Sequence, residues 1–237
     1  MANNSLHGTL GLNFSLLRRL RALHLDWNHL SGHLPASLSR CRELRVVNLR
    51  RNNLSGPVPS AFRRLQALSF FDIGNNSITS IAQAFRTLQE CRALTVLILT
   101  INFQGVEMPA VGQIPPWLGG FDSLYRIDLS NNVLTGEIPL SLTRLKSLDG
   151  NARCVQVSMS LYGVRLHNWH IDRGQLWYNH YIPPTLDLSR NGLTGAIRPE
   201  LGDLRALSIL NLSWNALSGT IPATLASLSA LQTLDLS

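Results

Sequence analysis

The sequence has almost no lysine, few charged residues and no long apolar run. Lys146 is the only lysine among 237 residues, and Asp, Glu, Lys and Arg together make up 15% of the chain. The longest apolar run lies near Ala93 to Leu99 and is far too short to span a bilayer. No apolar run follows Met1, so we expect no signal peptide in the first residues. With 45% apolar residues, the composition suits a packed core rather than a disordered chain.

The signatures of several enzyme classes are also missing. The chain has no G-x-x-x-x-G-K-[ST] loop, no glycine-rich loop before a strand lysine, no H-R-D or D-F-G, and no G-x-S-x-G elbow. We therefore expect no kinase domain and no catalytic residue. The spacing of Cys154, His167, His170 and His180 matches no usual zinc site, so we predict no metal and no cofactor. The net charge of +7, without a motif, does not predict nucleic-acid binding.

The sequence does contain a repeat. Its clearest copy, L-Y-R-I-D-L-S-N-N-V-L-T-G-E-I-P, runs from Leu124 to Pro139. Four of the seven intervals between its asparagines are 24 residues long. A fixed period in this range is typical of a leucine-rich-repeat solenoid. The asparagines that mark the copies are Asn4, Asn28, Asn52, Asn76, Asn102, Asn132, Asn191 and Asn215.

The repeat predicts the local structure of each unit. In L-x-x-L-x-L-x-x-N the leucines point inward, and the residues between them form a short strand with alternate side chains facing out. The asparagine amide satisfies backbone groups of the bend that follows, and the I-P step keeps the return path extended. One unit cannot bury its apolar edge alone, so neighbours stack. We predict an α/β-type solenoid, a right-handed superhelix with a parallel sheet on its concave face. We expect few regular helices, with mostly 3-10 or irregular structure on the convex side.

Cysteines and arginines carry less information. Cys41 and Cys91 occupy the same C-R-x-L slot two repeats apart, so roughly 10 Å separates them, too far for a disulfide. We expect both to be buried.

Nearly all the basic charge is arginine, which favours two-pronged contacts with sulfate, phosphate or carboxylate. Many of these arginines lie outside the strands, where a solvated face is the simpler interpretation.

Two intervals break the period. Asn102 to Asn132 spans 30 residues, and Asn132 to Asn191 spans 59, which is 35 more than the standard 24. The longer excess is rich in tyrosine and tryptophan, and long insertions in repeat arrays are often part of the binding face. We divide the chain into repeats over residues 1–148, an insertion over 149–182 and repeats over 183–237. Because both termini cut through a repeat, we expect a fragment or truncated product of something longer.

Sequons of the form N-x-S permit N-glycosylation if the parent protein is secreted. They begin at Asn3, Asn13, Asn53, Asn75 and Asn211.

Three stretches carry a more specific resemblance. F-F-D-I-G-N-N-S-I-T-S-I, L-I-L-T-I-N-F-Q-G-V-E-M-P and the exit L-W-Y-N-H-Y-I-P-P-T-L-D-L-S resemble the phytosulfokine receptor branch of plant leucine-rich-repeat receptor kinases. The resemblance runs from about Cys41 to the C-terminus. It implies that the insertion is an island domain, which folds over the concave face and helps to bind a short tyrosine-sulfated peptide. It also implies a plasma-membrane receptor with an extracellular peptide site, a co-receptor kinase as partner and an intracellular Ser/Thr kinase domain that this chain lacks.

The resemblance assigns candidate peptide-binding residues. Asn48 matches an asparagine in V-N-L, and Thr100 matches the threonine of L-x-L-T. Asp72 and Gly74 stand where the family has serines, Asp128 is the analogue of a family aspartate, and Arg165 matches a basic island residue across a gap. An acidic Asp72 would repel a sulfate, and two family repeats between Thr100 and the island repeat are missing. We therefore expect weakened or altered peptide binding.

Two other functions stay open. The chain fits a receptor-like protein without a kinase, or a secreted inhibitor of wall-degrading enzymes, although such inhibitors are usually uninterrupted. It also fits a non-functional truncated receptor copy, which the absence of a signal peptide, end caps and two repeats favours. The insertion favours the ligand-sensing receptor.

Overall fold

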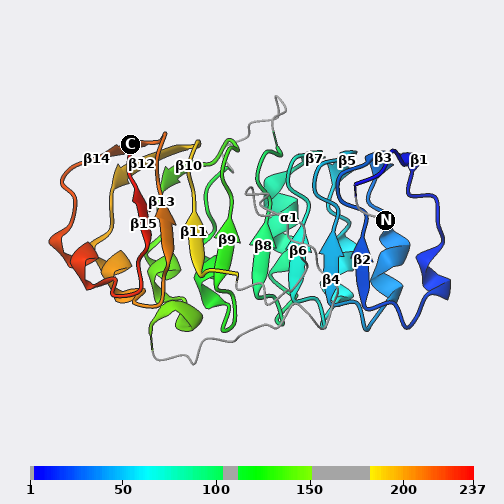
Figure 1. Cartoon of the computed structure of the whole chain (residues 1–237), viewed down its shortest axis with the longest axis horizontal. Coiled ribbons are helices and arrows are strands. Elements are labelled where there is room, and N and C mark those ends of the chain that lie inside the picture. The colour runs from blue at the N-terminus through cyan, green and yellow to red at the C-terminus, as the bar shows by residue number, and fades with distance from the viewer. Residues whose placement is uncertain (1–2, 104–111, 151–181) are drawn as a thin grey trace, which may run out of the picture.

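The computed structural model describes residues 3–103, 112–150 and 182–237, which form a stack of rungs (Figure 1). Each rung contributes one short strand to a parallel eight-stranded sheet with the order β15-β13-β11-β9-β8-β6-β4-β2. Its strands are β2 (Ala22–His24), β4 (Val46–Asn48), β6 (Phe70–Asp72), β8 (Val96–Ile98), β9 (Arg126–Asp128), β11 (Thr185–Asp187), β13 (Ile209–Asn211) and β15 (Thr233–Asp235). The predicted parallel sheet is confirmed.

The aliphatic positions of the repeat build the core. Val47, Phe71, Leu97 and Ile127 are partners in register across β4, β6, β8 and β9, and each is at most 1% exposed. The leucines at the other repeat positions stack in the same way through one continuous core. No single rung could bury these side chains, so the stability of each rung depends on its neighbours.

The return path of the rungs pairs into two further parallel sheets, which the repeat pattern does not predict. It predicts only that this path is extended. One sheet contains β1 (His7–Thr9), β3 (His29–His33), β5 (Asn53–Pro57) and β7 (Ser77–Thr79); the other contains β10 (Thr135–Glu137), β12 (Gly192–Ala196) and β14 (Ala216–Ser218). The glycine that recurs in the repeat has a positive φ, as at Gly56 with +71° and Gly136 with +76°, and this backbone conformation favours glycine.

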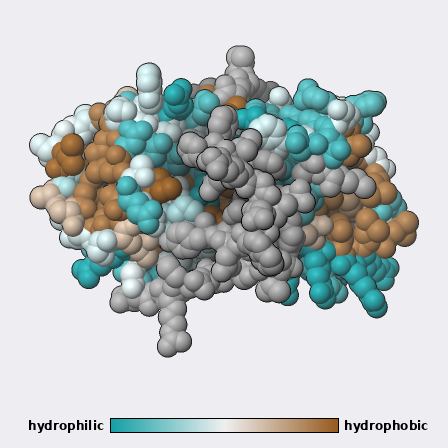
Figure 2. All heavy atoms as spheres, viewed as in Figure 1, coloured by the Kyte–Doolittle hydropathy of each residue, from teal (hydrophilic) through white to brown (hydrophobic). Residues whose placement is uncertain are grey.

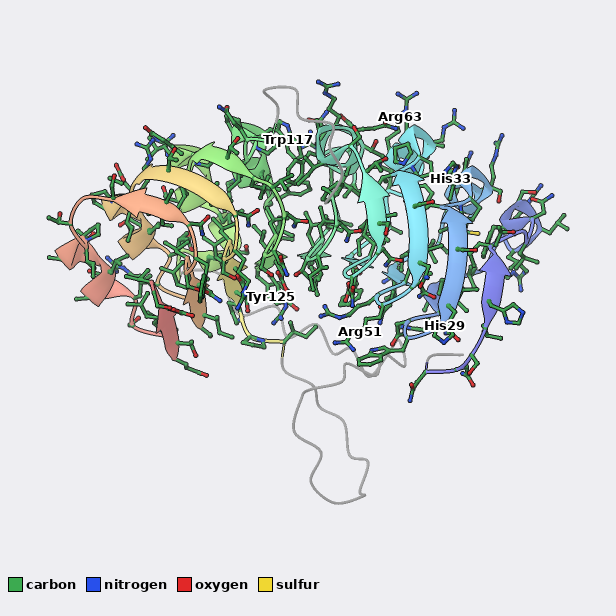
Figure 3. The ribbon with its side chains drawn as sticks, turned by 90° about the horizontal axis from the view of Figure 1, so that it is seen from above. His29, His33, Arg51, Arg63, Trp117 and Tyr125 are labelled. Atoms are coloured by element: carbon green, nitrogen blue, oxygen red, sulfur yellow. The ribbon has the colours of Figure 1, made fainter. Side chains whose placement is uncertain are left out.

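Helices cover the opposite side of the stack, and most are single 3-10 turns, as predicted. The eight-residue α1 (Ile81–Leu88) is the α-helix of the described chain, and it forms where the repeat lacks its G-x-I-P step. Figure 3 shows Arg63 and Trp117 on this outer side, and Arg51 and Tyr125 on the concave side. The 3-10 turns are η1 (Phe14–Leu16), η2 (Ala36–Arg40), η3 (Ser60–Arg64), η4 (Pro116–Gly120), η5 (Leu140–Arg144), η6 (Lys146–Leu148), η8 (Pro199–Asp203) and η9 (Ala223–Ser227).

The repeat asparagines form a buried ladder that joins neighbouring rungs. The Nδ2 of Asn76 donates to the carbonyl of Leu49 in the preceding rung at 3.0 Å and to that of Ile73 in its own rung at 2.9 Å. Its Oδ1 accepts the N–H of Leu54, also in the preceding rung, at 3.0 Å. Asn52, Asn132 and Asn215 make equivalent bonds. The predicted role of these asparagines in the bend is confirmed, and the bonds to the preceding rung extend it.

The residue before most of these asparagines adopts a left-handed conformation. Its φ lies between 52° and 57° at Trp27, Arg51, Asn75, Ile101, Asn131, Arg190 and Trp214. Four of these positions form two stacked pairs: the Arg51 guanidinium lies 3.9 Å from the Trp27 ring centroid, and that of Arg190 lies 5.1 Å from the Trp214 ring centroid. The turn therefore presents a periodic column of large side chains beside the strands.

The irregular intervals do not interrupt the main sheet. Strand β8 pairs directly with β9, and β9 pairs directly with β11, so that Arg126 lies between Val96 and Thr185 in register. The expected insertion at 149–182 and its closure over the concave face fall almost entirely outside the described residues. Cys41 and Cys91 are buried free thiols, as expected, and Cys154 lies outside the described residues.

Candidate functional site

The last residue of each main-sheet strand lies in one row on the concave face. The register places Asn48 beside Asp72, and Asp128 beside Asp187. Along the sheet the row runs His24, Asn48, Asp72, Ile98, Asp128, Asp187, Asn211 and Asp235. Three of the predicted peptide-binding residues, Asn48, Asp72 and Asp128, belong to this row.

Side-chain oxygens of this row close the turn after each strand that ends in Asn or Asp. Oδ1 of Asp72 accepts the N–H of Gly74 at 2.8 Å, and Oδ1 of Asp128 accepts that of Ser130 at 3.1 Å. Asn48 accepts the N–H of Arg50 at 3.3 Å. Such bonds from a carboxylate or amide to the backbone two residues on are Asx turns. The row therefore shapes the sheet edge.

Gly74 is the point at which the predicted residues converge. A Cβ built on Gly74 would lie 2.9 Å from Cγ2 of Thr100, 3.2 Å from Oδ1 of Asp72 and 3.3 Å from Nη1 of Arg50. Arg50 and Asp72 form an ion pair with a separation of 3.9 Å. The absence of a side chain at Gly74 thus lets a cation, a carboxylate and a hydroxyl-bearing side chain approach one another across three rungs.

A chain of hydrogen bonds extends this cluster to the next rung. The hydroxyls of Thr100 and Ser130 lie 2.9 Å apart, and Ser130 donates to Asp128 at 2.6 Å. The structure therefore brings Asn48, Asp72, Gly74, Thr100 and Asp128 onto the neighbouring rungs of β4, β6, β8 and β9. Arg165, the sixth predicted residue, lies outside the described residues.

The sequence-based prediction missed several residues of this cluster. It assigned no role to Arg50, Ser130 or Arg126, although Arg126 donates to the hydroxyl of Thr185 at 3.2 Å. The repeat contained the signal that would have found Arg50 and Ser130. Each stands two residues after the row, in the slot that Gly74 and Thr100 occupy in their own rungs.

Burial dominates the electrostatics of the row. Burial raises the pKa of Asp72 to about 6, and Asp128 contributes in the same direction. Arg50, the N–H of Gly74 and Arg126 act against this shift. The pKa of Asp187 is also raised, first by burial and then by Asp128, its neighbour in register. Asp72 is 2% exposed, so its carboxylate is a costly charge in the folded protein.

We predict that Asp72 makes the stability fall as the pH rises. Its folded pKa of about 6 exceeds the unfolded value of about 4, so the folded state binds the extra proton between these values. The free energy of unfolding should drop by about 2 kcal/mol between pH 4 and pH 6, and Asp72→Asn should remove this drop. Urea denaturation at half-unit pH steps measures it.

Asp235→Asn is the control for this prediction. Asp235 holds the same position in the last rung, but hydrogen bonds from Ser237 lower its pKa. This variant should keep the wild-type decline between pH 4 and pH 6. A decline that persists in Asp72→Asn would assign the pH dependence to another group.

The sequons fall in two environments. Asn3, Asn13 and Asn53 are exposed, whereas Asn75 and Asn211 are half-buried on the concave side. Asn211 also accepts the hydroxyl of Ser213, the third residue of its own sequon, at 2.7 Å. Glycosylation at the five asparagines remains a prediction, and the exposed three present the least obstructed amides.

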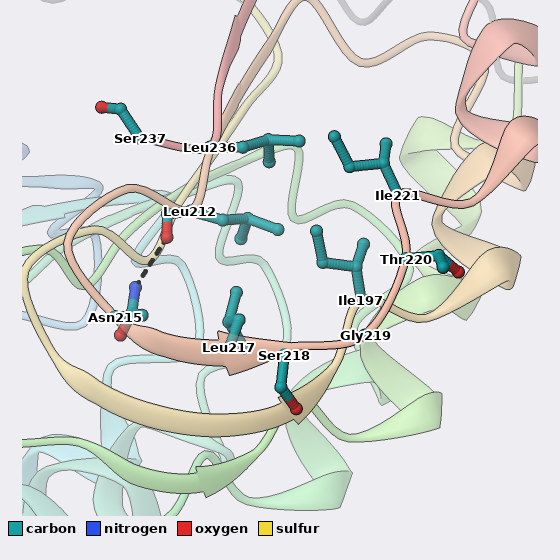
Figure 4. Close-up of a pocket in the computed structure, with 10 residues that line it drawn as sticks. All are labelled: Ile197, Leu212, Asn215, Leu217, Ser218, Gly219, Thr220, Ile221, Leu236 and Ser237. Carbon is teal, nitrogen blue, oxygen red and sulfur yellow. Dashed lines mark hydrogen bonds between the residues drawn. The ribbon is translucent and has the colours of Figure 1, made fainter.

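A small cavity of about 220 Å³, lined by both apolar and polar residues, lies at the last described rung (Figure 4). Leu212, Leu217 and Leu236 line it together with Ile197 and Ile221. In Figure 4 the dashed bond joins Asn215 to the Leu212 carbonyl, at 2.9 Å. The lining repeats the stacking positions that fill the core elsewhere, so the cavity is an end of the leucine stack, away from the Gly74 cluster.

Other kinds of site are not evident in the described part of the chain. Within residues 3–103, 112–150 and 182–237, no group of three or more His, Cys, Asp or Glu is placed to hold a metal ion. Among the helices of these same segments, none has the length and apolar character needed to cross a membrane.

Family descriptions match the repeats. "Leucine rich repeat" matches residues 42–102, and a second description, "Leucine Rich Repeat", matches 19–41, 123–145, 185–204 and 206–228. Together the matched residues make up more than half of the chain. A curated relative, Phytosulfokine receptor 1 of Arabidopsis thaliana, is 36% identical over 81 residues, which cover 26% of this chain and 8% of that protein.

Solved structures share the whole fold. The plant peptide hormone receptor RGFR1, in complex with RGF2, superposes with a TM-score of 0.75 and 27% identity over 100% of this chain and 31% of that one. The Arabidopsis receptor kinase HAESA, in complex with the peptide hormone IDA and the co-receptor SERK1, gives 0.76 and 28% over 99% and 33%. A plant ice-binding protein, at 24% identity and a TM-score of 0.68, shares the fold. The chain spans about a third of the length of these two receptors.

Proposed function

Because the chain belongs to the leucine-rich-repeat proteins, and its fold matches receptor ectodomains solved with peptide hormones, we propose that it is the ligand-sensing region of a plant receptor. It binds a short peptide hormone on the concave face, on the extracellular side of the plasma membrane. The bound peptide is presented to a co-receptor with leucine-rich repeats, as the HAESA complex with SERK1 suggests. The observation that carries this proposal is the convergence of polar side chains around Gly74.

The Gly74 cluster suits an extended peptide. Thr100 and Ser130 donate their hydroxyl protons along the chain towards Asp128 and offer oxygen lone pairs as acceptors, and Asp128 and Asn48 offer further acceptors on flanking rungs. Neighbouring strands lie about 4.8 Å apart, so a peptide that crosses them meets a new polar group on each rung. The cluster lies on a rigid sheet, so these groups are arranged before the peptide binds, which lowers the cost of binding.

The negative charge of Asp72 affects the affinity of the site for a sulfated tyrosine. Arg50 is the cation nearest to Asp72, at 3.9 Å, and its side chain is 30% exposed. We propose that a sulfate approaches Arg50 and is opposed by the neighbouring Asp72 carboxylate. The peptide is then a tyrosine-sulfated one that binds more weakly than it would with an uncharged residue at position 72. Arg165, by the resemblance, adds a second basic contact.

Calorimetric titration with synthetic phytosulfokine, in its sulfated and unsulfated forms, tests this site. We expect the sulfated form to bind more tightly to the wild-type chain. Asp72→Ser, which introduces the serine of the resembling family, should strengthen binding of the sulfated form by about tenfold, because a like charge is removed from a partly buried site. Binding of the unsulfated form should change by less than twofold.

Two controls separate this effect from a general one. Asp235→Asn removes one negative charge from the same row four main-sheet strands away from β8, and it should leave both affinities unchanged. Thr100→Val removes the hydroxyl that faces Ser130 and should weaken both peptide forms about equally, by roughly tenfold. A folded wild-type chain that binds neither form, or that ignores the sulfate, would overturn the corresponding part of the proposal.

A further inference from the structure

The basic charge is concentrated in the N-terminal rungs. Residues 1–103 contain 12 arginines and 4 acidic residues, a net charge of +8. Residues 104–237 contain 9 basic and 10 acidic residues, a net charge of −1. Two parts of one solenoid with the same repeat therefore carry very different charges. The repeat itself does not require this asymmetry, since its core slots are apolar in both parts.

Most of these arginines lie along one edge of the stack, where the main-sheet strands begin. Arg18, Arg42 and Arg92 each stand two residues before the first core leucine of a rung, and Arg40 and Arg64 stand four residues before it. All five side chains are exposed, as are those of Arg19 and, on the adjoining outer side, of Arg63 in η3 and Arg86 in α1. We call these eight arginines the basic edge. Figure 2 shows hydrophilic side chains along the lower edge at the right-hand end, where Figure 1 places the N-terminal rungs.

The basic edge is largely uncompensated within the chain. An ion pair of 2.9 Å joins the neighbouring Arg21 to Glu43, and both side chains are well exposed. None of the eight arginines forms an ion pair with a carboxylate of the described residues. In the C-terminal rungs, by contrast, Lys146 at this edge is paired with Asp122 at 2.7 Å. The basic edge thus keeps its guanidinium groups available for an external anion.

We propose that the basic edge binds a linear acidic polysaccharide, with uronate carboxylates as the groups recognised. Rungs recur about every 4.8 Å, and a uronate chain offers one carboxylate per ring at a similarly regular interval. Guanidinium groups bind carboxylates through paired N–H donors. Several weak contacts along one polymer add up through avidity, although each exposed pair contributes little. This surface is separate from the peptide site, and the choice of a polysaccharide rests on the extracellular placement proposed above.

Two other polyanions fit the edge less well. Single-stranded nucleic acids are usually bound by basic grooves interleaved with aromatic platforms. Among the described residues, Trp214 is the exposed large aromatic side chain, and it lies in the C-terminal rungs. A membrane surface favours apolar side chains beside the cations. Exposed Leu12, Leu16 and Leu17 belong only to the first rung, whereas the arginines continue over the following rungs.

Binding of the full chain to polygalacturonate, measured by biolayer interferometry across salt concentrations, tests the proposal. Arg64→Gln/Arg92→Gln should weaken binding about fivefold and reduce its salt dependence. The matched control is Arg144→Gln/Arg205→Gln, which removes exposed arginines from the same two slots of C-terminal rungs. The control should change the affinity by less than twofold. Fully methyl-esterified pectin, which lacks the carboxylates, should not bind.

Other outcomes would overturn the proposal. Equal losses in the two double variants would show that net charge, rather than the basic edge, drives binding. Tighter binding to single-stranded DNA or to phosphatidylserine vesicles than to polygalacturonate would assign the edge to another polyanion. Both double variants should retain wild-type titration with sulfated phytosulfokine. Loss of peptide binding with polysaccharide binding intact would therefore count against the proposed function alone.

Discussion

Asn76→Ala is expected to lower the free energy of unfolding by about 4 kcal/mol. The amide of Asn76 is bonded to the carbonyls of Leu49 and Ile73 and to the N–H of Leu54, all within 3.0 Å, and the residue is 8% exposed. Alanine leaves these backbone groups buried without the side-chain partner, at about 1–2 kcal/mol each. Because two of the bonds reach the preceding rung, the loss also loosens the contact between rungs.

Urea denaturation followed by circular dichroism measures this effect. Asn53→Ala is the control, because Asn53 has an exposed side chain at the start of β5, in the preceding rung. We expect a change below about 0.5 kcal/mol for the control. A loss of less than 1 kcal/mol in Asn76→Ala would mean that the ladder is replaceable, for instance by water, and that leucine stacking alone holds the rungs in register.

The asparagine ladder illustrates how much of the fold the sequence predicts. Asn76 and its equivalents recur with the leucines, so a single unit already indicates an inward strand followed by a bend. The pairing of β5 with β7, and of β10 with β12, was not predicted. Those strands are marked only by a glycine and an extended path, and their pairing depends on how closely the rungs stack. Local sequence patterns predict the structure of a single rung, whereas the pairing in the two side sheets depends on how the rungs stack.

The candidate site was likewise predicted only in part. Asn48, Asp72, Gly74, Thr100 and Asp128 were predicted from the resemblance, and the register does bring them onto neighbouring rungs. Their role as peptide-binding residues stays a prediction. The raised pKa of Asp72 could not be predicted, because it arises from burial in the fold and from Asp128, which lies 56 residues away in the sequence. Nor could the sequence show that an added Cβ at Gly74 would press on Thr100.

Neighbouring helical turns make close backbone contact at two glycines, and we expect a substitution there to lower the stability strongly. A Cβ built on Gly119 in η4 would overlap the carbonyl of Ser141 in η5 and lie 2.9 Å from the backbone nitrogen of Leu142. Gly202 in η8 meets the backbone of Thr224 in η9 in the same way. Backbone atoms cannot move aside as a side chain can. A larger residue at either glycine must therefore push two rungs apart along the whole stack.

Gly119→Ala should lower the free energy of unfolding by about 3 kcal/mol, because overpacking against a backbone costs up to this amount in a filled core. Gly120→Ala is a control from the next position of the same 3-10 turn, since a Cβ on Gly120 meets nothing within 4 Å. Alanine at Gly120 should be neutral or slightly stabilising, through the lower entropy of the unfolded chain. Urea denaturation of both variants separates the two cases. An equal loss of stability in both variants would implicate the flexibility of the Gly119–Gly120 pair. A loss in Gly119→Ala alone would show that contact between the turns sets the distance between rungs. That distance also sets the spacing of the polar row on the concave face.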